Sequence, residues 1–184
     1  MKDNIYKKGK IVNSTIIDGH AHLYPDDSAS KVIGRFTDLH KMEPRNGIGL
    51  GTVTDLQNKM EESGTGYTVV ANFASLKGLR KTNEWTLNIC KENENLIPLV
   101  SIHPDMTLSE IKDYFDNGAC GIKMHNGIQD FEPMDSGLTD IYKYCNDNRI
   151  PITFHCGETS RVHMNEYTDI DHIIPVVKKY PDIP

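Results

Sequence analysis

The chain has 184 residues, and its 20 Lys and Arg against 26 Asp and Glu give a formal net charge of −6. Hydrophobic residues make up 38% of the chain and charged residues 25%, a composition that excludes a disordered, collagen-like or membrane-embedded protein. No basic excess is available to neutralise phosphates, so nucleic acid is not an expected partner.

The length predicts a single domain over residues 1–184. The four cysteines form no Cys-x-x-Cys pair and each lies among apolar residues, so we expect buried, reduced thiols and a cytoplasmic location. These cysteines are Cys90, Cys120, Cys145 and Cys156. The charged N-terminal start is not followed by the apolar stretch of an export signal.

Short apolar segments alternate with longer amphipathic ones along the chain. The apolar segments, rich in Val and Ile, predict five strands at residues 15–22, 67–74, 96–103, 119–125 and 149–156. The amphipathic segments predict five helices at residues 52–63, 83–93, 108–117, 138–147 and 169–180. The polar segment 24–51, which contains Pro25, Pro44 and several glycines, is predicted to be a long loop after the first strand.

Strands that alternate with helices through short links are typical of parallel βαβ units, so the fold class is α/β. A complete (β/α) barrel needs eight units and about 250 residues. Five units therefore predict either an open sheet of about five strands or the front part of a longer barrel.

Asp18, His20 and His22 alternate at the end of the first predicted strand. Alternate side chains of a strand point to one face, so we expect all three on the same side. Two imidazoles can bind one divalent metal ion there, and Asp18 could accept a ring N–H from one of them. The alternative is a pair of surface histidines in a loop.

Three further histidines, His103, His125 and His155, lie at or near the ends of the third, fourth and fifth strands. Converging imidazoles indicate either a metal site or a polar cluster around an anionic substrate. We expect His155 to point the way His20 and His22 do. The alternative for His155 is a core histidine bonded to a backbone carbonyl, and for His103 a structural role is as well supported as substrate binding.

Lys123 shares a strand face with His125. A lysine that points into a buried site needs an anionic partner or a lowered pKa, and it could bind a substrate carboxylate, act as a base or carry a carbamate. The alternative is a lysine that reaches solvent at the strand end. Gln129 and Glu158, in the loops after the fourth and fifth strands, are candidate substrate contacts or simply solvated loop residues.

Three motifs in this order, IIDGHAHLYP, GIKMH and PITFHCGE, resemble the amidohydrolase superfamily, and most closely its amidohydrolase-related branch of metal-dependent hydrolases. The resemblance runs from Ile16 to the C-terminus. It implies a TIM-type (β/α) barrel with one or two divalent metal ions, usually zinc, at the carboxyl ends of the strands. His20, His22 and His155 match metal ligands, and Lys123 matches a position where some members carry a carboxylated, metal-bridging lysine.

The family also uses a His on strand six and an Asp on strand eight, and the Asp is usually the general base. Both would follow Pro184, so we expect an incomplete barrel of about five to six of the eight units. The resulting prediction is a metal-dependent hydrolase acting on a small molecule, with Lys123 and His125 as catalytic residues and His103, Gln129 and Glu158 as substrate contacts. The alternatives are a decarboxylase, a phosphoesterase, or a truncated non-catalytic metal-binding chain whose open apolar edge favours homo-oligomers.

Overall fold

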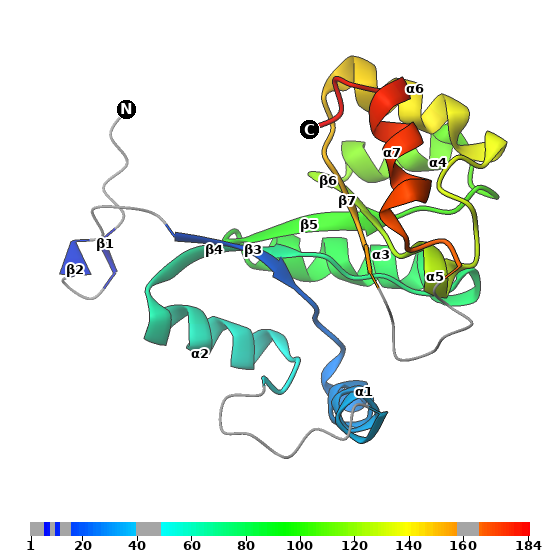
Figure 1. Cartoon of the computed structure of the whole chain (residues 1–184). Helices are drawn as coiled ribbons and strands as arrows, with labels where there is room; N and C mark the ends of the chain where they lie inside the picture. The colour runs from blue at the N-terminus through cyan, green and yellow to red at the C-terminus, as the bar shows by residue number, and fades with distance from the viewer. Residues whose placement is uncertain (1–5, 8–9, 12–15, 40–48, 158–165) are drawn as a thin grey trace.

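The computed structural model describes residues 6–7, 10–11, 16–39, 49–157 and 166–184. Its centre is a five-stranded parallel sheet in which each strand pairs with the next along the chain (Figure 1). The strands are β3 (Ile16–Ala21), β4 (Thr65–Val70), β5 (Leu96–Ser101), β6 (Gly121–Met124) and β7 (Ile152–Phe154). This order confirms the five predicted strands and their parallel arrangement. A separate antiparallel pair, β1 (Tyr6–Lys7) and β2 (Lys10–Ile11), precedes the sheet.

The five predicted helices are all present. They are α2 (Val53–Ser63), α3 (Leu76–Glu92), α4 (Leu108–Asp116), α6 (Thr139–Asn148) and α7 (Ile170–Lys179). Thr107 and Glu110 form the expected capping box of α4, and Gly64 ends α2 in the left-handed conformation. Two short elements, α5 (Asn126–Gln129) and the 3-10 helix Ser136–Leu138, follow β6.

The prediction of a loop over residues 24–51 is wrong in its first part, where α1 spans Asp26–Leu39. Proline is tolerated at the start of a helix, and the Pro25 carbonyl accepts hydrogen bonds from the N–H groups of Ser28 and Ala29. Two aspartates in the first turn suit the helix dipole. Gly34 inside the helix costs about 1 kcal/mol, which the remaining turns outweigh. Residues 40–48 lie outside the described part of the chain.

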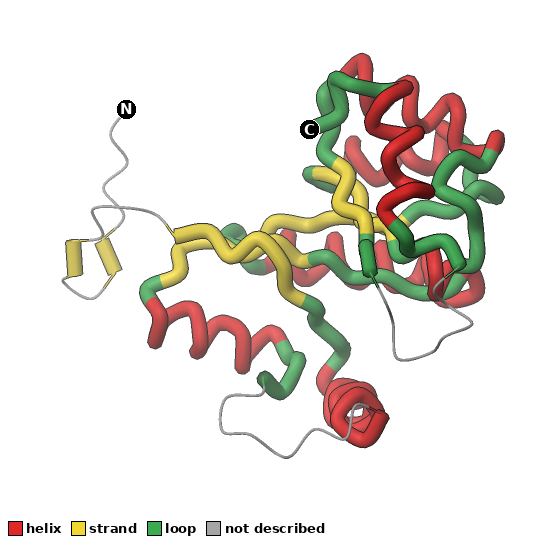
Figure 2. The backbone as a smooth tube through the Cα atoms, viewed as in Figure 1, coloured by secondary structure: helices red, strands yellow, loops and turns green. Residues whose placement is uncertain are grey.

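Helix α2 packs on β4 and α3 packs on β5, and α4, α6 and α7 gather beside β6 and β7 (Figures 1 and 2). Ile122 and Met124 of β6 and Ile152 of β7 belong to the main hydrophobic cluster under α4, α6 and α7. A smaller cluster, which includes Met60 and Val70, lies under α2 and α3. Because side chains alternate, residues between these positions, such as Lys123, face the other side of the sheet.

Gly121 allows three strands to pack closely at the start of β6. A Cβ atom at this position would lie 2.9 Å from both the Leu99 side chain and the Pro151 carbonyl oxygen.

Of the cysteines, Cys90 and Cys145 are buried as expected, whereas Cys120 and Cys156 are exposed because they lie in the turns that flank β6 and β7. Among the described residues, none of the helices combines the length and the apolar character needed to span a bilayer.

Candidate active site at the carboxyl ends of the strands

A register irregularity in β3 separates Asp18 from the two histidines that follow it. Asp18 pairs with Thr68 and Ala21 pairs with Val70, so β3 has one residue more than β4 between these two pairs. Asp18 consequently lies on the helix-covered side, where it lines a cavity with Leu56 and Met60 of α2. Its carboxylate accepts the backbone N–H of His20 at 3.1 Å instead of a ring N–H. The expectation that Asp18 shares a face with His20 and His22 is therefore corrected.

The His20 and His22 rings meet directly, with 3.1 Å between their Nε2 atoms. Burial and the charge of Lys123 lower the pKa of His20. Burial, followed by the charges of His20 and Lys123, lowers the pKa of His22 to about 4. Both imidazoles are therefore neutral at pH 7, and neutral imidazole is the form that binds metal ions.

His125 and His155 form a second ring pair at the ends of β6 and β7. Their rings stack at a centroid distance of 3.8 Å with only 8° between the planes. Burial and the neighbouring charges of His155 and Lys123 lower the pKa of His125 to about 3. The Nδ1 atom of His125 accepts the backbone N–H of Ile128, and this bond assigns the ring proton to Nε2. Burial and the charge of Lys123 also lower the pKa of His155, whose buried Nε2 atom has no hydrogen-bond partner among the described residues.

Phe73, just after β4, connects the two histidine pairs. Its ring centroid lies 5.2 Å from that of His22 and 4.5 Å from that of His125. The result is one continuous row of rings across the strand ends, in the order His20, His22, Phe73, His125, His155. Sequence reasoning missed Phe73 because it considered only titratable residues at the strand ends. Its place at the end of the second predicted strand was the signal that could have found it.

Lys123 lies beneath this row, with only 1% of its surface exposed. Burial lowers the pKa of Lys123 to about 8, and its charge in turn lowers the pKa of all four histidines in the row. Within the described residues no carboxylate pairs with its ammonium group. Lys123 therefore does not reach solvent, and it places an uncompensated cation next to the neutral imidazoles.

Gln129 and His103 do not join the row. Gln129 is buried, and both ends of its amide are already used: Oε1 accepts the His125 backbone N–H at 2.7 Å, and Nε2 donates to the Ile102 carbonyl at 2.9 Å. His103 accepts the backbone N–H of Asp105 and packs against Phe131. Glu158 lies outside the described residues. Through its hydrogen bond to the His125 backbone N–H, Gln129 positions His125 directly after the end of β6.

A divalent cation suits part of this arrangement. Two nitrogen ligands about 2.0–2.1 Å from a tetrahedral zinc ion are about 3.3 Å apart, which is close to the 3.1 Å between the Nε2 atoms of His20 and His22. The buried Nε2 of His155, which has no partner within the described part of the chain, is a further nitrogen that could bind the ion. Over the described ranges, no three His, Cys, Asp or Glu side chains lie around a common point in the way that a metal site requires.

Comparison with known proteins identifies the family. The amidohydrolase family model matches residues 17–184. The chain belongs to the amidohydrolase family. No sequence among the curated proteins matches it.

Solved structures support the fold of this amidohydrolase. An uncharacterised TIM-barrel protein of Bordetella bronchiseptica has 17% identity and a TM-score of 0.71, over 92% of this chain and 65% of its own. The 5-carboxyvanillate decarboxylase of Sphingomonas paucimobilis has 13% identity and a TM-score of 0.62, over 91% of this chain and 65% of its own. A probable 2-pyrone-4,6-dicarboxylic acid hydrolase of Acinetobacter baumannii has 16% identity and a TM-score of 0.55, over 78% of this chain and 50% of its own.

These similarities confirm the prediction of an incomplete TIM-type barrel. The chain spans about 65% of the length of the Bordetella protein. Its five parallel strands form a curled part of such a barrel, with the helices outside and the row of rings at the carboxyl ends of the strands, where TIM-barrel active sites lie.

Proposed function

We propose that the row of imidazoles is the metal-dependent active site of an enzyme that hydrolyses a small, carboxylate-bearing molecule. The observation that carries this proposal is the convergence of four neutral imidazoles and one buried ammonium group from β3, β6 and β7 at one rim of the sheet. Polar groups with lowered pKa values are costly to keep together in a core, so such a cluster indicates function.

His20, His22 and His155 would hold the metal ion, and zinc is the ion that best suits three imidazole nitrogens. A bound divalent ion of this kind supplies an acidic water molecule and polarises a carbonyl group. Asp18 orients this part of the site through the backbone N–H of His20.

Lys123 and His125 would act on the substrate. The amine of Lys123 is mostly protonated at pH 7 because its pKa is about 8, and an anionic substrate would supply the counter-charge that the described residues do not provide. His125 carries its proton on Nε2, so it can donate a hydrogen bond to a substrate oxygen. Phe73 gives the site a flat apolar wall between the two histidine pairs.

Decarboxylation is the second candidate, and Lys123 is the observation that favours it. Loss of CO2 leaves an electron pair on the adjacent carbon, and a buried ammonium group beside that carbon can stabilise the charge and supply the proton that replaces the carboxyl group. The similar structures include a probable 2-pyrone-4,6-dicarboxylic acid hydrolase and a 5-carboxyvanillate decarboxylase. Release of CO2 distinguishes this reaction from hydrolysis.

The test is metal content and turnover of the purified protein supplied with zinc or manganese, using a panel of ring lactones and aromatic carboxylic acids. We expect the double variant His20→Ala, His22→Ala to lose bound metal and all turnover. His172→Gln is the matched control, because His172 lies on α7, where it pairs with Glu132 at 2.9 Å. Unchanged metal content in the double variant would overturn the proposal.

A further inference from the structure

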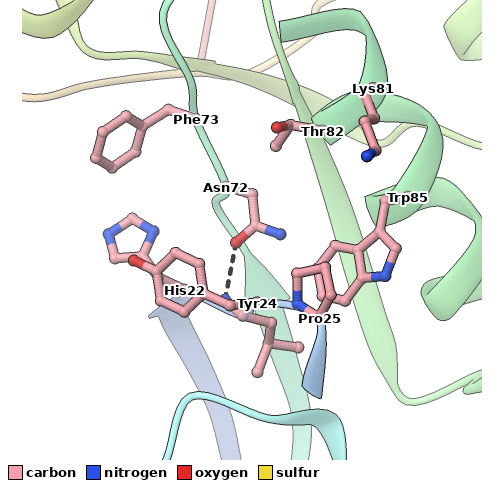
Figure 3. A pocket seen from close by; sticks show the side chains of 9 residues that line it. His22, Tyr24, Pro25, Asn72, Phe73, Lys81, Thr82 and Trp85 are labelled. Atoms are coloured by element: carbon pink, nitrogen blue, oxygen red, sulfur yellow. Dashed lines mark hydrogen bonds between the residues drawn. The ribbon is translucent and has the colours of Figure 1, made fainter. Parts of the chain in front are cut away.

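A separate cavity of about 150 Å³ lies beside His22, between the β3–α1 connection and helix α3 (Figure 3). We propose that it is a subsite for a flat, ring-sized group that carries an anionic substituent. The inference rests on the proposed function, because it names the part of the substrate that lies next to the imidazole row, but its polar contacts come from Lys81 and Thr82, which lie outside that row.

The size and the lining of the cavity favour a single ring. A cavity of about 150 Å³ in a protein core is large enough to hold benzene. Most of the lining is apolar and three of its residues are aromatic: Tyr24, Phe73 and Trp85. Figure 3 shows Trp85 with Pro25 at one end of the cavity, and Tyr24 and Phe73 around His22 at the other. A flat apolar group would therefore have aromatic rings on both sides.

Hydrogen bonds fix the walls before any ligand arrives. The Asn72 side chain accepts a hydrogen bond from the Leu23 backbone N–H at 2.8 Å and donates one to the Thr86 hydroxyl at 2.9 Å, so its amide oxygen and its amide nitrogen both have a partner. The backbone N–H of Tyr24 donates to the carbonyl of Gly51. Gly51 has a positive φ of 73°, and a Cβ atom there would lie 3.1 Å from the Tyr24 ring, so glycine allows this close approach. A preformed cavity loses little entropy on binding.

The polar groups that remain available favour an anion. Lys81 and Thr82 of α3 line the same side of the cavity, above Trp85 in Figure 3. Neither the Lys81 ammonium group nor the Thr82 hydroxyl makes an ion pair or hydrogen bond with another described residue. None of the lining residues is acidic. A carboxylate on the ring would thus find one positive charge and one hydroxyl donor, with no opposing negative charge.

Trp85 makes the proposal testable without metal or turnover. It is the single tryptophan of the chain and it lines the cavity, so its fluorescence reports occupancy directly. We would titrate the protein in EDTA with benzoate, benzyl alcohol and acetate, which separates the ring from the anion and excludes binding of the carboxylate to metal. We expect saturable quenching by benzoate, with at least tenfold weaker binding of both benzyl alcohol and acetate.

Two variants complete the test. Lys81→Met should weaken benzoate binding at least fivefold and leave benzyl alcohol binding unchanged. Lys77→Met is the matched control, because Lys77 is an exposed lysine one turn earlier on α3 that does not line the cavity, and it should bind benzoate normally. Absence of saturable quenching, equal binding of benzoate and acetate, or equal effects of the two variants would overturn the subsite. Metal-dependent turnover without benzoate binding would refute only the subsite, and benzoate binding without turnover would refute only the proposed function.

Discussion

Strands β3 and β6 carry similar functional residues but differ sharply in burial. All four residues of β6 are buried, and this strand is hydrogen-bonded to β5 on one side and β7 on the other. Ile16 and Ile17 of β3 are 52% and 58% exposed, and within the described residues β3 pairs only with β4. An apolar sequence therefore makes a strand, but its neighbours in the sheet decide whether that strand is buried.

The difference extends to the histidines at the two strand ends. His125 after β6 is held by ring stacking, by Gln129 and by the start of α5. His20 on β3 is exposed, and its ring contacts His22. The β6 side is thus preorganised, whereas the β3 side has fewer constraints and would gain most order from a bound ion.

The largest expected contrast in stability is between His125→Ala and His20→Ala. His125→Ala removes a buried ring from between Phe73 and His155, and we expect it to lower the free energy of unfolding by about 2–4 kcal/mol. His20→Ala removes an exposed ring and should cost about 0.5 kcal/mol or less. Urea denaturation of the metal-free variants measures both values. Equal losses would show that the two strand ends are equally ordered.

Lys123→Met should stabilise the fold while it abolishes activity. Burial lowers the pKa of Lys123 from 10.5 to about 8, so at pH 7 the folded state holds a proton that the unfolded state binds more strongly. Methionine avoids the free-energy cost of burying a charged ammonium group, so this substitution should raise the free energy of unfolding at pH 7 by about 2–3 kcal/mol. Lys59→Met, at an exposed position on α2, is the control and should change stability little. A destabilised Lys123→Met protein would mean that an unrecognised partner compensates the charge.

A smaller effect is expected from pH in the metal-free protein. The pKa values of His22 and His125 are about 4 and about 3 in the folded state, below the 6.5 of the unfolded chain. The unfolded state therefore binds more protons between these values, so stability is complete above pH 6.5 and falls as the pH drops toward 4. We expect His125→Phe to reduce the fall by on the order of 2 kcal/mol, measured from unfolding curves at pH 7 and pH 4.5. If the free energy of unfolding of His125→Phe falls as steeply between pH 7 and pH 4.5 as that of the natural chain, His125 is not buried in its neutral form.

The sequence predicts the strands because a buried parallel strand has a short continuous apolar run. It predicts the strand-end histidines because the carboxyl ends of parallel strands lie at the same edge of the sheet. It could not predict the bulge that turns Asp18 away, because an extra residue in one strand depends on the pairing with its neighbour. The sequence predicts Gln129 as a substrate contact or a solvated loop residue, because the bond that Gln129 makes to Ile102 joins parts of the chain that are distant in sequence. The sequence does not predict α1 because Pro25 and Gly34 both disfavour the interior of a helix, whereas Pro25 lies just before the first residue of α1.

The central claim is that His20, His22 and His155 share one cation, and NMR of the histidine ring nitrogens during a zinc titration tests it most directly. Our account predicts that the ring signals of these three residues shift together and saturate at the same zinc concentration, while those of His103 and His172 stay in place. Signals of His20 and His22 that shift without those of His155, or a zinc-induced shift of none of the three, would contradict it.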